Sequence, residues 1–283
     1  MKMVYNDNVL LYKKGYYNMK IFISADIEGI NSIVNWQETE LNEAEYQRAR
    51  HEMTKEVRAA CEACHDAGVE EIFIKDAHDS ARNLIIEELP EYVKLHRAWQ
   101  GSPQVMMAGI EEGFDGAIYI GYHSEAQNPY NSLSHTMNGG IMDVTINGIK
   151  ASEFVINSYM ATYYKVPSIF LAGDKALTES AKALFNDIET VASKEGLHGA
   201  VVSKHPTVTY KEIYDGVTKA LKKDLKAQIQ EMPKSFDIKI QYKSHIDAYR
   251  YSFFPGCKLI GPTTVQYKAK NYYDCMVLMK FIL

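Results

Sequence analysis

The sequence predicts an α/β protein: a main domain with a mostly parallel sheet flanked by helices, followed by a smaller α+β domain. Between residues 20 and 75 an apolar strand, an amphipathic helix and a second strand follow one another, an order that favours a parallel pair joined by a crossover. Beyond residue 200 a charged helix, an alternating strand and glycine–proline turns indicate a separate unit. We therefore expect an extension at residues 1–18, a metal-binding catalytic domain at 19–200 and a smaller domain at 201–283.

The first half of the chain predicts three strands and two helices. Residues 20–25 and 69–75 are short apolar strands, and a third apolar run covers residues 116–121. Apolar residues recur at helical spacing from Tyr46 to about Gly68, after a possible capping pair of Asn42 and Glu45. A second helix is expected from Ser102 to Gly113, because Ser-Pro opens and glycine closes it.

The second half continues the same alternation. Asn147-Gly148 lies between alternating residues and predicts a hairpin. The remaining expected elements are helices at 152–164, 179–185, 209–232 and from about 271, and strands at 168–172 and 236–242. Pro233 is expected to end the long helix.

Composition excludes several classes of protein. The formal net charge is −5 and no stretch concentrates Lys and Arg, so nucleic acid is not an expected partner. No apolar run reaches the length of a membrane span and the first 18 residues lack the apolar core of a signal peptide. Four cysteines form no disulfide framework, which fits a reducing compartment and predicts a cytoplasmic protein. Met19, where strand character begins, is a candidate for the biological start.

Acidic and imidazole side chains follow the three predicted strands of the first half. Asp26 and Glu28 lie two residues apart after the first strand, so in extended chain both carboxylates point to one side. His78 and His123 follow the second and third strands. Either feature alone is commoner as a solvated loop or a hydrogen-bonded structural histidine. Together they predict a dication site at one edge of the sheet.

Two further residues are candidates for the same site. His135 lies among small and polar residues and could bind metal or move protons. Glu153 begins a predicted helix, where an acid is also favoured by the helix dipole alone. Cys61 and Cys64 have redox spacing but lie near the end of a helix, which indicates a structural role. The chain contains no Walker loop, dinucleotide-binding fingerprint, HExxH or GxSxG motif.

Several segments resemble successive motifs of the D-aminopeptidase family of bacterial zinc peptidases. These are residues 24–30 (SADIEGI), 76–80 (DAHDS), 121–123 (GYH), 134–137 (SHTM), 153–172 and 261–266 (GPTTVQ). They occur in the family's order and at similar separations, so the resemblance covers nearly everything from Met19 onward. Lys75 and Ala77 depart from the small polar residue and the serine common in the family, which puts in doubt the groups around His78.

The resemblance implies a site with two zinc ions per chain. The implied ligands are Asp26, bridging both ions, Glu28 and His78 on the first, and His123 and Glu153 on the second. His135 would be the catalytic base, and the chain would assemble as a homodecamer that admits only short peptides. Oxygen and imidazole ligands suit zinc, manganese and cobalt alike.

The resulting hypothesis is a zinc-dependent aminopeptidase that hydrolyses short peptides or amides with an N-terminal D-amino acid by metal-activated water. A two-metal phosphoesterase is the first alternative, since the same ligands can clamp phosphate oxygens; it would need Lys or Arg near the metals, and Lys75 and Arg82 are the nearest in sequence. The second is a non-catalytic peptide-binding or shell protein stabilised by zinc, although structural zinc sites favour cysteine.

Overall fold

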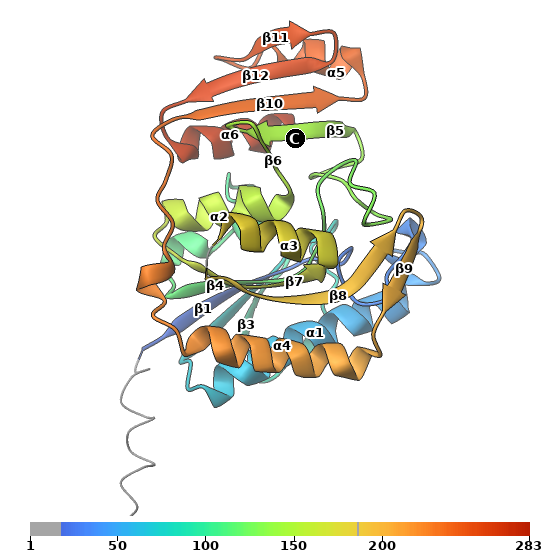
Figure 1. Cartoon of the computed structure of the whole chain (residues 1–283), viewed down its shortest axis with the longest axis vertical. Helices are drawn as coiled ribbons and strands as arrows, with labels where there is room; N and C mark the ends of the chain where they lie inside the picture. The colour runs from blue at the N-terminus through green and yellow to red at the C-terminus, as the bar shows by residue number, and fades with distance from the viewer. Residues whose placement is uncertain (1–17, 186) are drawn as a thin grey trace, which may run out of the picture.

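The computed structural model describes residues 18–185 and 187–283, which form two sheets (Figure 1). The first sheet has seven strands in the order β3 (Val93–His96), β2 (Glu71–Asp76), β1 (Lys20–Ala25), β4 (Gly116–Tyr122), β7 (Ser168–Asp174), β8 (Glu189–Leu197) and β9 (Ala200–Ser203). All its pairs are parallel except β8 with β9. The second sheet has five strands in the order β11 (Lys258–Gly261), β12 (Thr264–Ala269), β10 (Phe236–Tyr242), β5 (Ile141–Ile146) and β6 (Ile149–Lys150). The predicted α/β class is confirmed.

Helices cover both faces of the seven-stranded sheet. On one face α1 (Tyr46–Asp66) packs against α4 (Pro206–Leu221), and on the other lie α2 (Glu153–Tyr163) and α3 (Lys175–Leu184) (Figure 1). The sequence explains α1 directly, because Ala49, Met53, Val57 and Cys64 recur at helical spacing and all are buried. Burying this stripe against the sheet removes it from water and fixes the helix on that face.

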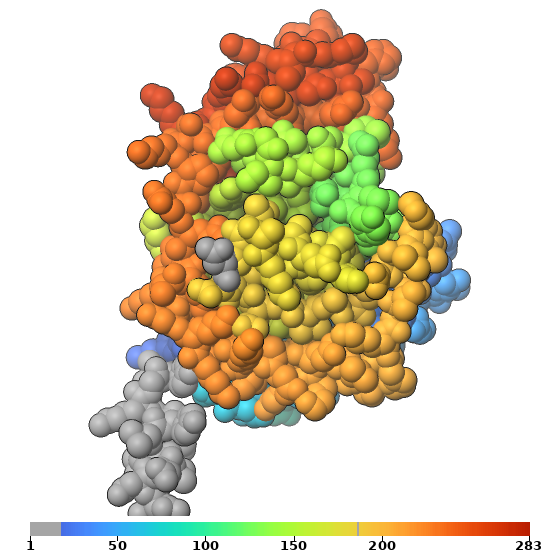
Figure 2. Space-filling view, in the orientation of Figure 1, coloured from blue at the N-terminus to red at the C-terminus, as the bar shows by residue number. Residues whose placement is uncertain are grey.

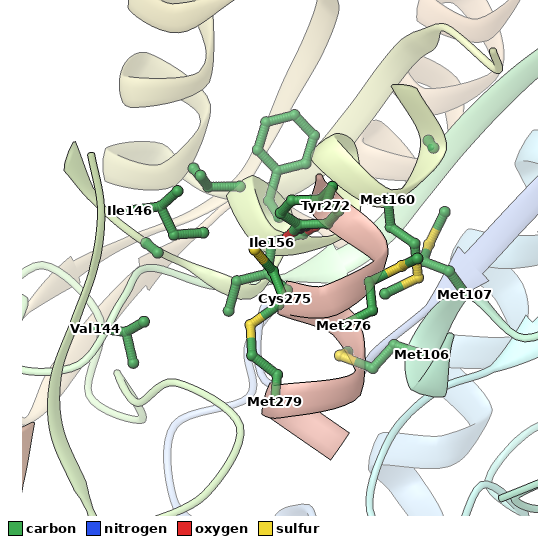
Figure 3. Packing of buried hydrophobic residues seen from close by; sticks show 14 of the residues in the cluster. Met106, Met107, Val144, Ile146, Ile156, Met160, Tyr272, Cys275, Met276 and Met279 are labelled. Carbon is green, nitrogen blue, oxygen red and sulfur yellow. Dashed lines mark hydrogen bonds between the residues drawn. The ribbon is translucent and has the colours of Figure 1, made fainter. Parts of the chain in front are cut away.

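The five-stranded antiparallel sheet stacks beyond α2. Its helices are α5 (His245–Tyr251), which packs on β10 and β12, and α6 (Tyr272–Ile282), which also contacts α2. Methionines of both layers meet around α6, among them Met106, Met160 and Met276 (Figure 3). In Figure 2 the red C-terminal segments lie directly against green segments, whose colour covers β5, β6 and α2. One apolar cluster therefore joins the second sheet to the first.

The division of the chain near residue 200 stays a prediction. Each layer contains elements from both sides of that position. β5 and β6 come before residue 200 but pair in the second sheet, and α4 comes after it but packs on the first. Of the predicted extension, residues 1–17 lie outside the described residues. Within the described ranges, no helix combines the length and the apolarity that crossing a bilayer requires.

Three local predictions are wrong. Helix α1 begins without a side-chain cap, and Asn42 has φ 80°, outside the usual cap conformation. Residues 102–113 form only two short 3-10 turns, η3 (Val105–Met107) and η4 (Ile110–Glu112), because Ala108 between them is non-helical with ψ 127°. Helix α4 ends at Leu221 rather than near residue 232, and the Asp224 carboxylate accepts hydrogen bonds from the next two free amides, of Lys226 and Ala227, which starts a separate turn.

The chain order reverses at the centre of the first sheet. From β1 the chain builds outward through β2 and β3, and then returns to the other side of β1 with β4 and β7. Such a switch point opens a crevice at the carboxyl ends of the two central strands. Here the loop after β1 lies against the end of β4: Gly29 N–H donates to the Gly121 carbonyl at 2.7 Å. Gly121 has φ +74°, a conformation that favours glycine.

We expect Gly29→Ala to destabilise the protein strongly. An alanine Cβ there would lie 1.8 Å from the Tyr122 carbonyl oxygen, so two backbone segments would have to separate. The free energy of unfolding, measured with urea, should fall by about 3 kcal/mol. Gly199→Ala is the matched control, because its Cβ would meet nothing within 4 Å; equal stability of the two variants would contradict the close approach.

Candidate metal centre

The carboxyl ends of the three central strands place four candidate residues side by side. Asp26 and Glu28 follow β1, His78 follows β2 and His123 follows β4, and these strands are neighbours in the sheet. Asp26, Glu28 and His123 are almost completely buried and His78 is 8% exposed. The sequence prediction that these residues lie together at one edge is therefore met by the structure.

The other two candidates, His135 and Glu153, come from segments that follow β4 and lie at the same place. His135 lies in the long connection between β4 and β5. Glu153 is the first residue of α2, whose N-cap Ser152 accepts a hydrogen bond from the Val155 N–H. The β5–β6 hairpin immediately precedes α2 along the chain. All six predicted site residues thus meet at one point.

Short nitrogen–oxygen distances connect the cluster. The two oxygens of Asp26 face different imidazoles: Oδ1 lies 3.3 Å from His78 Nδ1, and Oδ2 lies 3.6 Å from His123 Nε2. Glu28 Oε2 lies 3.0 Å from His78 Nδ1. On the other side, Glu153 Oε2 lies 3.5 Å from His123 Nε2. Asp26 is therefore the central residue of two groups of ligand-type side chains.

His135 lies beside the second group. Its Nε2 is 3.6 Å from Glu153 Oε1 and 3.9 Å from Glu28 Oε1. Its ring stacks on the ring of His123, with centroids 4.3 Å apart and planes 9° apart. Two sets of donor atoms are compact enough to hold a single ion, one of His123, His135 and Glu153 and the other of Asp26, Glu28 and His123.

Each histidine uses its outer nitrogen on a backbone carbonyl. His78 Nε2 lies 2.9 Å from the Thr39 oxygen, and His123 Nδ1 and His135 Nδ1 lie 2.9 Å from the oxygens of Ser124 and Leu133. A carbonyl can only accept, so the outer nitrogen carries the proton. The inner nitrogen of a neutral ring then presents its lone pair to the carboxylates, which is the tautomer that metal-binding histidines use.

The cluster fits divalent cations. Asp26 Oδ2 and His123 Nε2 are buried without a hydrogen-bond partner among the described residues, and buried polar atoms are normally satisfied. Three carboxylates and three imidazoles offer hard and borderline donors, and no cysteine takes part. This donor set suits zinc, manganese or cobalt.

The pKa shifts of the site residues in the absence of metal also indicate a cation site. Burial and then the neighbouring Glu28 carboxylate raise the pKa of Asp26 well above its usual value. Burial opposes charge on His123, but the Glu153 and Glu28 carboxylates outweigh it and raise its pKa to about 10. Burial, and next the charge of His123, lower the pKa of His135. Excess negative charge is thus balanced by protons that a bound cation would replace.

The pKa values of Glu28, Glu153 and His78 are also set by burial and by neighbouring charges. Burial would raise the pKa of Glu28, yet the charge of His78 outweighs it and holds that pKa well below its usual range. The His123 charge likewise outweighs burial and lowers the pKa of Glu153. Burial opposes charge on His78, but Glu28 and Asp26 raise its pKa well above the ordinary value.

A buried polar layer supports the loop that follows β1. The Lys194 ammonium is 2% exposed as a residue and donates to the carbonyl oxygens of Glu28 and Ile33. Ser193 Oγ donates to the Gly29 carbonyl at 2.5 Å, and the Asn31 N–H donates to Glu56 Oε1 at 2.9 Å. These contacts fix the backbone that carries Asp26 and Glu28. They were not predictable from the sequence, because lysine, serine and glutamate in a strand and a helix form no motif.

The cluster lines a cavity of about 610 Å³. Its wall includes Trp36, Trp99, Val105, Met106 and Met137. Trp36 contacts the His135 ring edge-on, with centroids 5.3 Å apart. Neither tryptophan was predicted to belong to the site; they are the only two in the chain, and their rarity was the available signal.

Comparisons with known proteins agree with the motif resemblance. Residues 19–281 match the model of peptidase M55, described as D-aminopeptidase. The chain is 29% identical over 266 residues to a D-aminopeptidase of Bacillus subtilis strain 168, covering 92% of this chain and 96% of that protein. It is also similar to a solved structure, the zinc-dependent D-aminopeptidase DppA from Bacillus subtilis, described as a self-compartmentalizing protease. The TM-score is 0.88 at 27% identity, over 93% of this chain and 96% of that chain.

We expect zinc to raise the melting temperature of metal-stripped protein. A ligand at a hundredfold excess over its Kd stabilises the folded state by about 2.7 kcal/mol, roughly 5 °C or more for a chain of this size. Asp26→Asn keeps an oxygen to accept the Ile27 N–H but loses a charge facing both imidazoles, so its zinc-induced shift should disappear while the metal-free melting temperature stays equal or rises. Asp143→Asn, at a surface ion pair with Lys150, is the control. An unchanged zinc shift in Asp26→Asn would exclude this cluster as the binding site.

Glu56 should make stability depend on pH. Burial, opposed by the Asn31 hydrogen bond, raises its pKa from 4.5 to about 8. The folded state therefore holds a proton that the unfolded state releases, and stability falls as pH rises from about 4.5 to about 8. Relative to wild type, Glu56→Gln should gain stability over this window, by up to a few kcal/mol, and gain no more above it. Urea unfolding at pH 5 to 9 measures the difference; parallel curves for the two proteins would contradict it.

Proposed function

Because the chain belongs to the D-aminopeptidase family of hydrolases, peptidase M55, we propose that it is a zinc-dependent aminopeptidase. Its substrates are short peptides or amides with an N-terminal D-amino acid, and it uses two zinc ions per chain. The observation that carries the proposal is the buried cluster of three carboxylates and three histidines at one end of a cavity of about 610 Å³. A cavity of this size can admit a short peptide.

The distances fit the proposed assignment of ligands. Asp26 would hold both ions, since its oxygens face His78 and His123 separately at 3.3 and 3.6 Å. Glu28 would complete the set around His78, at 3.0 Å from it, and Glu153 the set around His123, at 3.5 Å. Three protein ligands per ion, with Asp26 counted for both, would leave coordination positions open, which is typical of catalytic rather than structural sites.

His135 is the proposed catalytic base. It lines the cavity, and its lowered pKa keeps the imidazole neutral and able to accept a proton at physiological pH. The Leu133 carbonyl fixes the tautomer with Nε2 free. Dications held there would lower the pKa of a water molecule and polarise the scissile carbonyl. His135 Nε2 would take the proton released in attack and deliver it to the leaving amine.

The phosphoesterase alternative loses support. Its phosphate group would need lysine or arginine at the site, and no described residue lining the cavity is either. Lys75 is buried, and its Nζ donates to the carbonyls of Asp76 and Ala98. A purely structural zinc role is disfavoured because open cavity space adjoins the cluster and no cysteine contributes.

We also propose that the chain assembles into a homo-oligomer, with the homodecamer as the expected form. The related solved structure is described as a self-compartmentalizing protease, and an enclosed assembly would admit only short or flexible peptides. Light scattering of the purified protein measures the mass; a monomer that is fully active would contradict this part of the proposal.

The direct test is hydrolysis of matched D- and L-alanyl dipeptides and amides. Metal-stripped protein should be inactive, and resupply of zinc should restore release of D-alanine, with about two ions bound per chain. Protein that binds two zinc ions and cleaves neither series would overturn the proposal.

His135→Ala separates the base from the ligands. Turnover of a D-alanyl dipeptide should fall by on the order of a hundredfold or more, because the proton acceptor is lost. Zinc content, measured by mass spectrometry of the metal, should stay at the wild-type value. Loss of one zinc ion in this variant would make His135 a ligand instead.

A further inference from the structure

The two tryptophans of the chain, Trp36 and Trp99, line the same cavity. They are 41% and 40% exposed. Trp36 packs on His135, and the Trp99 indole N–H donates to the Asp79 carbonyl at 2.7 Å, one residue after His78. The cavity wall therefore contains two indole rings with different contacts.

Trp99 is held in place by a buried lysine. The Lys75 ammonium lies 4.4 Å from the centre of the Trp99 ring, a cation–π contact. The same ammonium donates to the Ala98 carbonyl at 2.7 Å and to the Asp76 carbonyl at 2.7 Å. Ala98, directly before the tryptophan, has φ 68°, a conformation that alanine adopts only under constraint. The lysine thus fixes both the indole and the backbone that presents it.

The charge of Asp76 favours a cation at this position, but burial outweighs it. Lys75 is 0% exposed and, among the described residues, forms no ion pair within 4 Å. Burying an ammonium is costly unless its donors are satisfied, and burial lowers the pKa of Lys75 to about 8. Its partners are two carbonyls and one indole, so the effect of its burial is to hold residues 98–99 in position. With one face of the ring covered by the ammonium, the exposed part of Trp99 faces the cavity.

We propose that Trp99 is a specificity-determining residue that contacts the apolar side chain of the substrate's N-terminal residue, and that Lys75 is its positioning residue. Val105 and Met106 continue the same apolar lining. The Trp36 ring packs on His135, the proposed catalytic base, whereas the Trp99 ring contacts Lys75 and the Asp79 carbonyl and so has a surface free for the substrate side chain. This inference rests on the proposed aminopeptidase function, because it assigns one part of the same cavity.

Steady-state kinetics with two amides test the assignment. The substrates are D-alanine amide and D-phenylalanine amide, which differ only in apolar side-chain size. Trp99→Ala should raise KM for the phenylalanine amide on the order of tenfold, while kcat and the KM for the alanine amide stay within about twofold. Lys75→Met, which keeps the apolar stem and loses the ammonium, should shift the same KM in the same direction by a smaller factor.

Lys94→Met is the matched control. Lys94 lies on the neighbouring strand β3, where its partner is Glu71 at 2.9 Å and its side chain is 64% exposed; both KM values should stay at wild type. If Trp99→Ala changes both amides equally, or lowers kcat without changing KM, the specificity role is wrong. If Lys75→Met keeps the wild-type KM ratio while Trp99→Ala alters it, the positioning role of Lys75 is wrong.

Tryptophan fluorescence provides a readout that needs no turnover. D-phenylalanine, added to zinc-loaded protein, should change the emission of a Trp36→Phe variant, in which Trp99 is the only tryptophan, more than D-alanine does. The change should be absent in Trp99→Phe, and Lys75→Met in the Trp36→Phe background should weaken D-phenylalanine binding. If the protein binds D-phenylalanine selectively but hydrolyses neither amide, the proposed function is wrong and the role of Trp99 stands. If the protein hydrolyses the amides but Trp99 emission shows no selective change, the role of Trp99 is wrong and the proposed function stands.

Discussion

The contact between the loop after β1 and the end of β4 is the constraint on which the rest of the site depends. Asp26 N–H donates to the Ile120 carbonyl at 2.8 Å and Gly29 N–H to the Gly121 carbonyl at 2.7 Å, so the loop continues the pairing of the two strands beyond their ends. This places Asp26 beside His123 although 97 residues separate them along the chain. The sheet order supplies the crevice, and the absence of a side chain at Gly29 lets the backbones approach.

Holding such a loop requires buried polar groups that a sheet edge does not normally contain. Lys194, Ser193 and Glu56 reach it from β8 and α1, and each satisfies a backbone group of residues 28–33. Their desolvation is unfavourable, and it is offset by two apolar clusters, one on each face of the seven-stranded sheet. The free energy gained by apolar packing thus offsets the cost of holding several charged side chains together, as is common where a fold carries a catalytic site.

The sequence predicted those parts in which local pattern and tertiary structure agree. Strand exits marked by Asp26, His78 and His123 were identifiable because apolar runs end abruptly at acid or imidazole, and all six candidate residues meet in one cluster. Edge elements such as β3 and β9 were missed because they are short and half-exposed, without a continuous apolar run. The pairing of β5 with β10 was not predictable from either segment, since antiparallel register across about 90 residues leaves no local signal. Lys75 looked like a departure from a motif, and its contact with Trp99 exists only after folding.

The position of Glu153 links the metal centre to the outer sheet. The β5–β6 hairpin belongs to the five-stranded sheet and ends at Lys150, three residues before this carboxylate. An ion held by both Asp26 and Glu153 would cross-link the two layers. Thermodynamic linkage then makes the effect reciprocal: any contact on the outer sheet that favours one placement of the hairpin changes ion affinity by the same factor by which the ion favours that contact. A contact on the outer sheet could therefore alter ion affinity through the β5–β6 hairpin.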